Sequence, residues 1–195
     1  MKEDSCSYKV LFYSLLSIIF ATVIHFYGQS IYDEYLLEEK NKKLLQFSEI
    51  NYINKQLDEF YIPLSIQLDR SKRLFLDFKT KYKNKNSILD INQSSSQLER
   101  AEWRLYLLSI FKSTHIRMED LVISKRYLSN KNKELNDKLN ILVQHINQYK
   151  VIFKKWGDGN TSEDISPVHF PNTLNDLVKS DIKKLQLKKE KLLKR

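Results

Sequence analysis

Glycine, proline and cysteine are scarce in this chain of 195 residues, which holds three, three and one of them. Tight turns depend on glycine and proline, so their shortage argues against an all-β sandwich or a doubly wound α/β fold. The glycine-rich phosphate motifs GxGxxG and GxxxxGK[ST] are both missing. The single cysteine, Cys6, excludes an internal disulfide framework and a cysteine-based zinc cluster. This composition favours a protein of long helices.

Charge is missing from one stretch near the N-terminus. Residues 10–27 read VLFYSLLSIIFATVIHFY, eighteen residues without Asp, Glu, Lys or Arg. A membrane-spanning helix needs about 17–25 apolar residues, so we expect a tail over residues 1–9 and a transmembrane helix over residues 10–29. A cleaved signal peptide is the alternative. The run is longer than a usual signal h-region, and the residues after Tyr27 form a poor cleavage site, which favours an uncleaved anchor.

The orientation of this helix follows from the basic residues that flank it. Lys2 and Lys9 precede the run, whereas Lys40, Lys42 and Lys43 follow it, a small excess on the C-terminal side. The lysine-rich, cysteine-poor composition suits a bacterial cytosol. We therefore expect a single-pass protein of the bacterial inner membrane, with the N-terminus outside and the bulk of the chain in the cytoplasm. A periplasmic sensor domain is the alternative.

Small and weakly polar residues share one side of the expected span. At 100° per residue, one helical sector holds Ser14, Ser17, Ala21, Thr22 and His25. Transmembrane helices use such residues to approach one another and to form hydrogen bonds. These five residues therefore predict an inter-subunit face or the lining of a pore in a homo-oligomer. For His25 alone, a simple place at the membrane interface is the alternative.

Amphipathic helices are expected in the remainder of the chain, residues 30–195. The apolar spacing predicts helices over 49–82, 101–128 and 131–156, and a basic C-terminal helix over 172–195. Pro63 should kink or restart the first of them, and a break is expected near Ser113-Thr114 in the second. The fold class predicted is therefore all-α: one N-terminal transmembrane helix followed by a helical-bundle domain.

Three shorter signals mark the connections between these helices. Residues 83–96 are polar and predict a loop, and Ser96 begins a capping box with Glu99. Gly157 is expected to occupy the left-handed position that ends the helix over 131–156.

Positive charge is concentrated at the C-terminus. Residues 179–195 contain eight basic and two acidic residues, which supplies six of the nine net positive charges of the chain. Such a segment could bind RNA or anionic lipid headgroups, or it could be a solvated helix end. The candidate basic patch consists of Lys183, Lys184, Lys188, Lys189, Lys191, Lys194 and Arg195.

Catalytic motifs are missing. The four histidines lack metal-ligand spacing, and no serine or cysteine lies in a nucleophile-elbow motif, so we expect no metal, no cofactor, no small-molecule substrate and no enzyme. One comparison is informative. HEPN ribonucleases are helical bundles whose active site pairs an arginine with a histidine after four to six intervening residues. Here the nearest approaches are Asn140 and Lys138 before His145, which makes Asn140 and His145 weak catalytic candidates. A structural histidine is the alternative.

The single N-terminal span, the helical domain and the degenerate HEPN-like region from Asn140 to His145 together resemble the small membrane accessory protein of type VI-B CRISPR systems. The resemblance implies a HEPN-like bundle and an oligomeric ring in the inner membrane. Such a ring would support antiviral defence by permeabilising or depolarising the membrane when the RNA-guided nuclease is active. The missing arginine counts against ribonuclease activity.

Three functions follow as hypotheses. The first is a homo-oligomeric membrane protein of bacterial antiviral defence that forms a pore or depolarises the membrane when an RNA-targeting CRISPR effector triggers it. The second is a membrane-tethered helical module that binds RNA or a protein partner, such as an RNA-guided nuclease complex. The third is a HEPN-type ribonuclease at the membrane. The membrane and a second copy of the chain are the partners expected in the first case.

Overall fold

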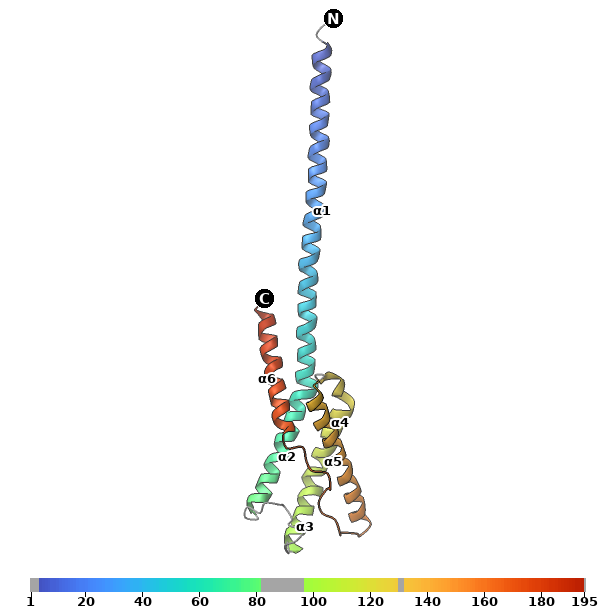
Figure 1. The fold of residues 1–195 in the computed structure, drawn as a ribbon, viewed down its shortest axis with the longest axis vertical. Coiled ribbons are helices and arrows are strands. Elements are labelled where there is room, and N and C mark those ends of the chain that lie inside the picture. Colours follow the sequence, from blue (N-terminus) through green and yellow to red (C-terminus); the bar gives the residue numbers. More distant parts are fainter. Residues whose placement is uncertain (1–3, 82–96, 130–131, 195) are drawn as a thin grey trace. The chain divides into compact units, whose positions relative to one another are not determined.

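The computed structural model describes residues 4–81, 97–129 and 132–194, and side chains from Phe12 onward (Figure 1). These residues form helices and the connections between them, with no strand in the parts described, which confirms the all-α class. The chain divides into two compact units, Met1–Glu49 and Ile50–Arg195. The boundary falls inside the first helix.

The helical elements, in chain order, are as follows. The first rod comprises α1 (Asp4–Gln56), η1 (Leu57–Tyr61) and α2 (Ile62–Lys81). The second comprises α3 (Gln97–Tyr106), η2 (Leu107–Phe111), α4 (Lys112–Lys125) and the short 3₁₀ turn η3 (Arg126–Leu128). The last two helices are α5 (Lys133–Gly157) and α6 (Leu174–Leu193).

The N-terminal unit is the part of α1 up to Glu49. Every side chain from Phe12 to Glu38 is exposed, and the helix is long and apolar enough to span a membrane. A signal sequence would meet the same criteria of length and composition. Two pairs one turn apart, Glu38 with Lys42 and Glu39 with Lys43, add ion pairs of 2.9 and 2.7 Å to its C-terminal part. In the part of the chain that the structure describes, none of the side chains from Phe12 to Tyr27 is buried.

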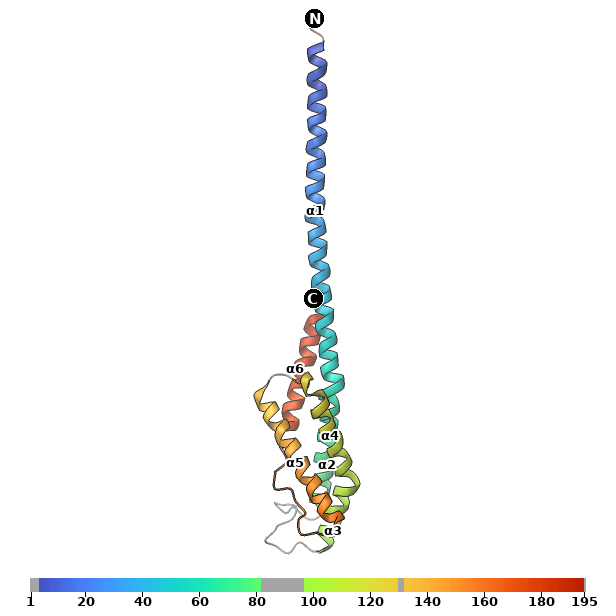
Figure 2. The ribbon, with the colours of Figure 1, turned by 90° about the vertical axis from the view of Figure 1, so that its right-hand side faces the viewer.

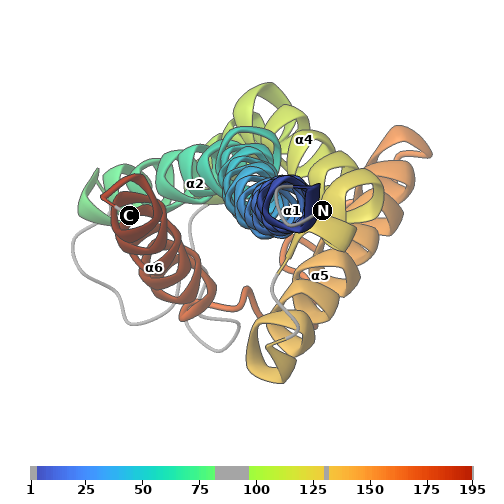
Figure 3. The same cartoon turned by 90° about the horizontal axis from the view of Figure 1, so that it is seen from above.

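The C-terminal unit is a helical bundle with two adjoining cores. Helix α2 packs against α4 and α6, and α5 also packs against α4 and α6 (Figure 3). The larger core is mostly aliphatic and includes Phe60, Leu64, Leu68, Met118, Leu139, Leu142 and Val178. The smaller core is rich in aromatic side chains and comprises Phe78, Trp103, Leu107, Phe111, Tyr149 and Ile152. Burial of these side chains is the main stabilising contribution to the bundle.

Helix α6 runs antiparallel to the first rod within this unit. Near its start, Asn175 and Lys179 bind the Asp69 carboxylate at 2.8 and 2.7 Å. Further along, Asp181 accepts a hydrogen bond of 3.4 Å from Tyr61, which precedes Asp69 in the chain. Figures 1 and 2 also show that α6 runs in the direction opposite to that of α2. The C-terminal end of α6 therefore lies at the end of the bundle where Ile50 begins the unit.

Pro63 is accommodated by a π-helical turn. The η1 turn ends at Tyr61, two residues before Pro63, and a π turn inserts one extra residue into the helical register. Because of this shift, the consecutive residues Phe60 and Tyr61 are both fully buried. The helix therefore continues through Pro63, and a different side of it faces the core after the π turn.

The break predicted near Ser113-Thr114 is wrong. The helix continues there, and the irregularity is the π turn η2 just before it. The hydroxyls of Ser113 and Thr114 both donate to the Ile110 carbonyl, at 2.9 and 3.0 Å. These residues therefore satisfy a carbonyl in the π turn instead of ending the helix.

Two predicted helix boundaries need correction. Gly157 is the last residue of α5, and Gly159, with φ of 83°, takes the left-handed position instead. Helix α6 begins at Leu174, two residues later than expected, because the Leu174 amide first closes a turn onto the Pro171 carbonyl at 2.9 Å. The predicted loop 83–96, including the Ser96 capping position, lies outside the described residues.

Candidate functional site

The predicted oligomer face lies on an exposed helix. Ser14, Ser17, Ala21, Thr22 and His25 all belong to α1 and are exposed. The Ser17 hydroxyl donates to the Ser14 carbonyl and the Thr22 hydroxyl to the Ile19 carbonyl, both at 2.8 Å. These two hydroxyls are thus satisfied within the helix, which lowers the cost of placing them in an apolar environment.

Asn140 lies on the exposed side of α5. Its side-chain oxygen accepts a hydrogen bond of 2.6 Å from Arg126, whose guanidinium also binds the Asn136 side chain and backbone oxygens at 2.9 and 3.1 Å. Asn140 therefore helps to hold the turn η3 against the start of α5.

His145 lies on another side of the same helix and is buried, with 8% exposed. Its Nδ1 atom is 2.5 Å from the Val168 carbonyl oxygen, in the loop of residues 158–173. Five residues along a helix correspond to about 140° of rotation, which explains the different surroundings of Asn140 and His145. The structure does not bring these two candidates together.

A second buried histidine was missed by the sequence analysis. The rings of His115 on α4 and His145 on α5 lie 5.6 Å apart, centroid to centroid, and each is also within 5.4 Å of the Tyr149 ring. The Nδ1 atom of His115 is buried and has no hydrogen-bond partner among the described residues. Thirty residues separate the two histidines, so their spacing gave no signal. Only the pairing of α4 with α5 brings them into contact.

The aromatic surroundings keep these groups uncharged. Burial, together with the nearby His145, lowers the pKa of His115 to about 3. Burial also lowers the pKa of His145, against the opposing effect of its bond to Val168. Burial raises the pKa of the Tyr149 hydroxyl to about 12. Neutral imidazoles beside a protonated phenol match the geometry of a packed interior.

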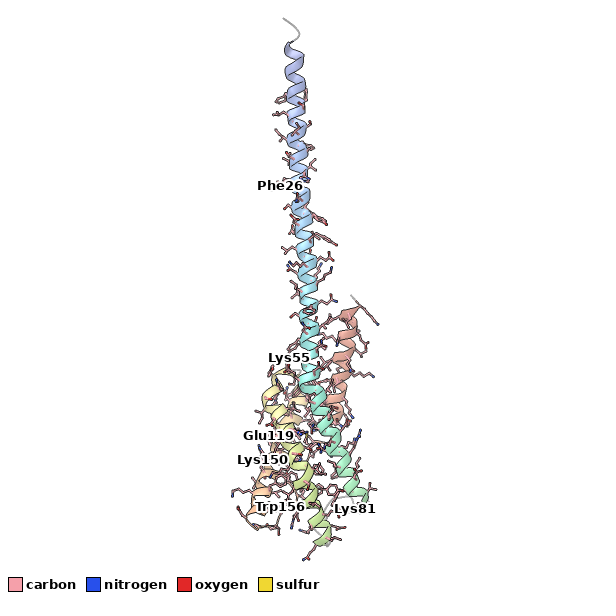
Figure 4. The ribbon with its side chains drawn as sticks, turned by 180° about the vertical axis from the view of Figure 1, so that it is seen from behind. Phe26, Lys55, Lys81, Glu119, Lys150 and Trp156 are labelled. Atoms are coloured by element: carbon pink, nitrogen blue, oxygen red, sulfur yellow. The ribbon has the colours of Figure 1, made fainter. Side chains whose placement is uncertain are left out.

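One ion pair connects α4 and α5 next to this cluster. Lys150 binds Glu119 at 2.5 Å, and the carboxylate is almost buried (Figure 4). Glu119 follows His115 by one helical turn, and Lys150 follows Tyr149, so the pair lies on the same two helices as the histidine cluster. Among the described residues, no group of three or more His, Cys, Asp or Glu side chains is placed to hold a metal ion.

The loop of residues 158–173 is held onto the bundle at Asp164. Its carboxylate is buried and accepts hydrogen bonds from Arg104 at 2.5 Å and Arg100 at 3.1 Å, while Trp103 donates to its backbone oxygen at 3.0 Å. Arg104 also lies over the ring of Trp156, 5.6 Å from its centroid. These contacts fix the loop that covers His145.

The predicted basic patch lies on α6, with Arg195 outside the described residues. Lys184 pairs with Asp181 at 3.1 Å, and Lys189 is half-buried. Lys183, Lys191 and Lys194 are exposed and form no ion pair with any described residue. Three uncompensated lysines therefore face outward from one helix.

No family model, curated protein or solved structure matches this chain. The proposals below therefore depend on its own residues and geometry.

Proposed function

We propose that this chain is a single-pass protein of the bacterial inner membrane that assembles as a homo-oligomer and acts on the membrane itself, without enzymatic chemistry. The observation that carries the proposal is the N-terminal helix, whose uncharged segment exposes every described side chain. A helix of this composition in water would leave a large apolar surface unburied, and a bilayer removes that surface from water.

Two further features support a span. The exposed side chains of Tyr13 and Tyr32 are 19 residues apart in the sequence, which is about 28 Å along a helix. That length is close to the roughly 30 Å of the hydrocarbon core, and tyrosine favours both membrane interfaces. The internally bonded hydroxyls of Ser17 and Thr22 suit the same environment.

Self-association is supported by the side of the helix that carries Ser14, Ser17, Ala21, Thr22 and His25. Small residues let helix backbones approach closely, whereas Phe12, Ile19, Val23 and other large side chains occupy the opposite side. A ring of copies would turn the small side toward its neighbours or toward a lumen. The setting in antiviral defence, triggered by an RNA-targeting CRISPR effector, is supported by the resemblance alone.

Oligomeric state and membrane potential test this proposal together. We expect the full-length protein, extracted in native nanodiscs, to contain several copies by single-molecule photobleaching, and its expression to depolarise cells in a dye assay. Ser17→Leu with Ala21→Leu should reduce the copy number and abolish depolarisation. Ile19→Leu with Val23→Leu, on the other side, is the matched control and should change neither. Monomers from the unmodified chain would refute the proposal.

A membrane-tethered module that captures RNA is the second candidate, and the exposed lysines of α6 favour it. Deleting residues 179–195 would be a poor test, because Leu185 and Leu192 belong to the core. Lys183→Gln, Lys191→Gln and Lys194→Gln remove charge without removing core side chains. In this alternative, the triple variant loses binding to labelled single-stranded RNA in a filter assay and keeps its oligomeric state.

A further inference from the structure

We infer that the outward face of α6 binds the anionic surface of the bilayer that anchors the chain. This inference rests on the proposed membrane anchor and adds a second membrane contact from the C-terminal unit. It does not depend on the number of copies in the assembly.

The packing of α6 fixes the direction of its lysines. Leu174, Val178, Leu185 and Leu192 are buried in the larger core and define the inner side of the helix. Lys183 and Lys194 lie about opposite this side, and Lys191 lies beside them, at 100° per residue. All three are exposed. The helix therefore presents its charge outward as a stable feature of the folded bundle.

Asp176 and Glu190 are exposed on the same side of α6 and offset part of this charge, whereas the other acidic groups beside the helix are bound elsewhere. Asp69 is occupied by Lys179 and Asn175, and Asp181 is buried and bound to Tyr61 and Lys184. Between residues 179 and 194, seven lysines stand against Asp181 and Glu190. Clusters of four to eight basic residues on one helix are typical of binding to anionic lipids, at about 1 kcal/mol for each residue near the surface.

The direction of α6 brings this charge to the appropriate end of the bundle. Because the helix is antiparallel to the first rod, its last lysines lie at the end where Ile50 begins the unit. The polypeptide that leads to the membrane leaves the bundle at this same end. A C-terminal helix that ran in the other direction would place the lysines at the far end.

The composition of the face favours lipid over RNA. Proteins that bind single strands combine basic residues with aromatic side chains on which bases stack, and α6 contains no aromatic residue. It exposes Leu187 and Leu193 among its lysines instead. Apolar side chains beside lysines are suited to the boundary between headgroups and acyl chains.

The connecting segment has the length and the surface for this contact. Residues 28–49 would extend about 33 Å as a straight helix, more than the Debye length of about 8–10 Å, so the contact requires this segment to incline toward the bilayer. The segment exposes several large apolar side chains, namely Ile31, Tyr32, Tyr35, Leu36, Leu37, Leu44, Leu45 and Phe47. An inclined segment would bury part of that surface at the membrane interface.

A fluorescence experiment on the full chain tests the inference. The chain with Cys6→Ser and Gln186→Cys, labelled at residue 186, is placed in nanodiscs of phosphatidylcholine with or without phosphatidylglycerol. Some headgroups carry a nitroxide quencher. We expect strong quenching only in the discs that contain phosphatidylglycerol, and loss of that quenching in high salt. Lys183→Gln, Lys191→Gln and Lys194→Gln together should also abolish it.

The matched control removes three lysines elsewhere on the bundle. Lys72→Gln, Lys133→Gln and Lys138→Gln should leave the quenching unchanged. Quenching that is equal in both lipid mixtures, or that survives the α6 triple variant, would overturn the inference. A lack of any quenching in a disc that contains the intact oligomer would also overturn the inference. That result would not contradict the proposed self-association. RNA binding lost in the triple variant, without a response to phosphatidylglycerol, would assign the face to nucleic acid instead.

Discussion

His115 and His145 show how single residues gain their properties from the bundle. In the sequence each is an isolated histidine on an amphipathic helix, and neither has a partner at a recognisable spacing. In the structure both rings are buried against Tyr149, and burial lowers both pKa values below the ordinary 6.5. The histidines therefore couple the stability of the C-terminal unit to pH.

The folded state should lose stability as the pH falls below about 6.5. In this range the unfolded chain protonates His115, whereas the folded chain does not until the pH nears 3. Stability is thus full above 6.5 and declines toward the folded pKa. Between pH 7 and pH 5, we expect His115 to account for about 2 kcal/mol of the loss in unfolding free energy. Urea unfolding of the full chain in detergent, followed by the fluorescence of Trp103 and Trp156, measures it.

His115→Gln provides the control for this prediction. It keeps a polar side chain and cannot be protonated, so the difference in unfolding free energy between pH 7 and pH 5 should shrink. An equal pH dependence in the variant and the unmodified chain would show that His115 is already charged, or exposed, in the folded state.

Asp164 should be the most sensitive acidic residue of the loop of residues 158–173. Asp164→Ala leaves Arg100 and Arg104 without their carboxylate, and we expect a loss of about 2 kcal/mol in unfolding free energy, since both arginines are partly exposed. The same urea titration measures it. Asp158→Ala removes an exposed pair with Lys154 and should cost less than 0.5 kcal/mol, or about the value of a surface ion pair. Equal effects would contradict the anchoring role of Asp164.

At the scale of an element, the end of α5 allows a prediction of opposite effects at two neighbouring glycines. Gly159 has a φ of 83°, so Gly159→Ala should destabilise the unit by about 1 kcal/mol. Gly157 lies in the helix with no atom near a new Cβ, so Gly157→Ala should be neutral or stabilise by up to about 1 kcal/mol. Thermal unfolding by circular dichroism distinguishes them. If Gly157→Ala destabilised the unit and Gly159→Ala did not, the left-handed residue would be Gly157, which would contradict the prediction.

The helices themselves could be predicted from apolar spacing, but their irregular turns could not. The pattern around Pro63 and around Ser113 indicated that the helices change there. A π turn is stabilised by the burial of its side chains against other elements. The buried side chains here are Phe60 and Tyr61 in the first turn and Leu107 and Phe111 in the second. The residues that bury them belong to other elements of the bundle. Local sequence can therefore predict where a helix is irregular more readily than it can predict the kind of irregular turn.

At the scale of the whole molecule, composition predicted the all-α class and the apolar N-terminal helix, because both depend on local patterns. The partners of buried polar residues were out of reach. Asp164 is 60 residues or more from Arg104 and Arg100, and Tyr61 is 120 residues from Asp181. Contacts at such separations arise from the arrangement of helices, and helical periodicity carries no information about it.

The topology of the chain is the last prediction, and the single cysteine makes it testable. Cys6 precedes the apolar run, and the lysine bias favours an external N-terminus. In intact spheroplasts we expect a membrane-impermeant maleimide to label Cys6 of the unmodified chain. A variant with Cys6→Ser and Ser180→Cys, on the exposed side of α6, should react only after the membrane is opened by detergent. Labelling of residue 180 in intact spheroplasts would place the bundle outside. It would also expose the lysines of α6 to the outer leaflet, where the proposed contact would need anionic lipids on that side of the membrane.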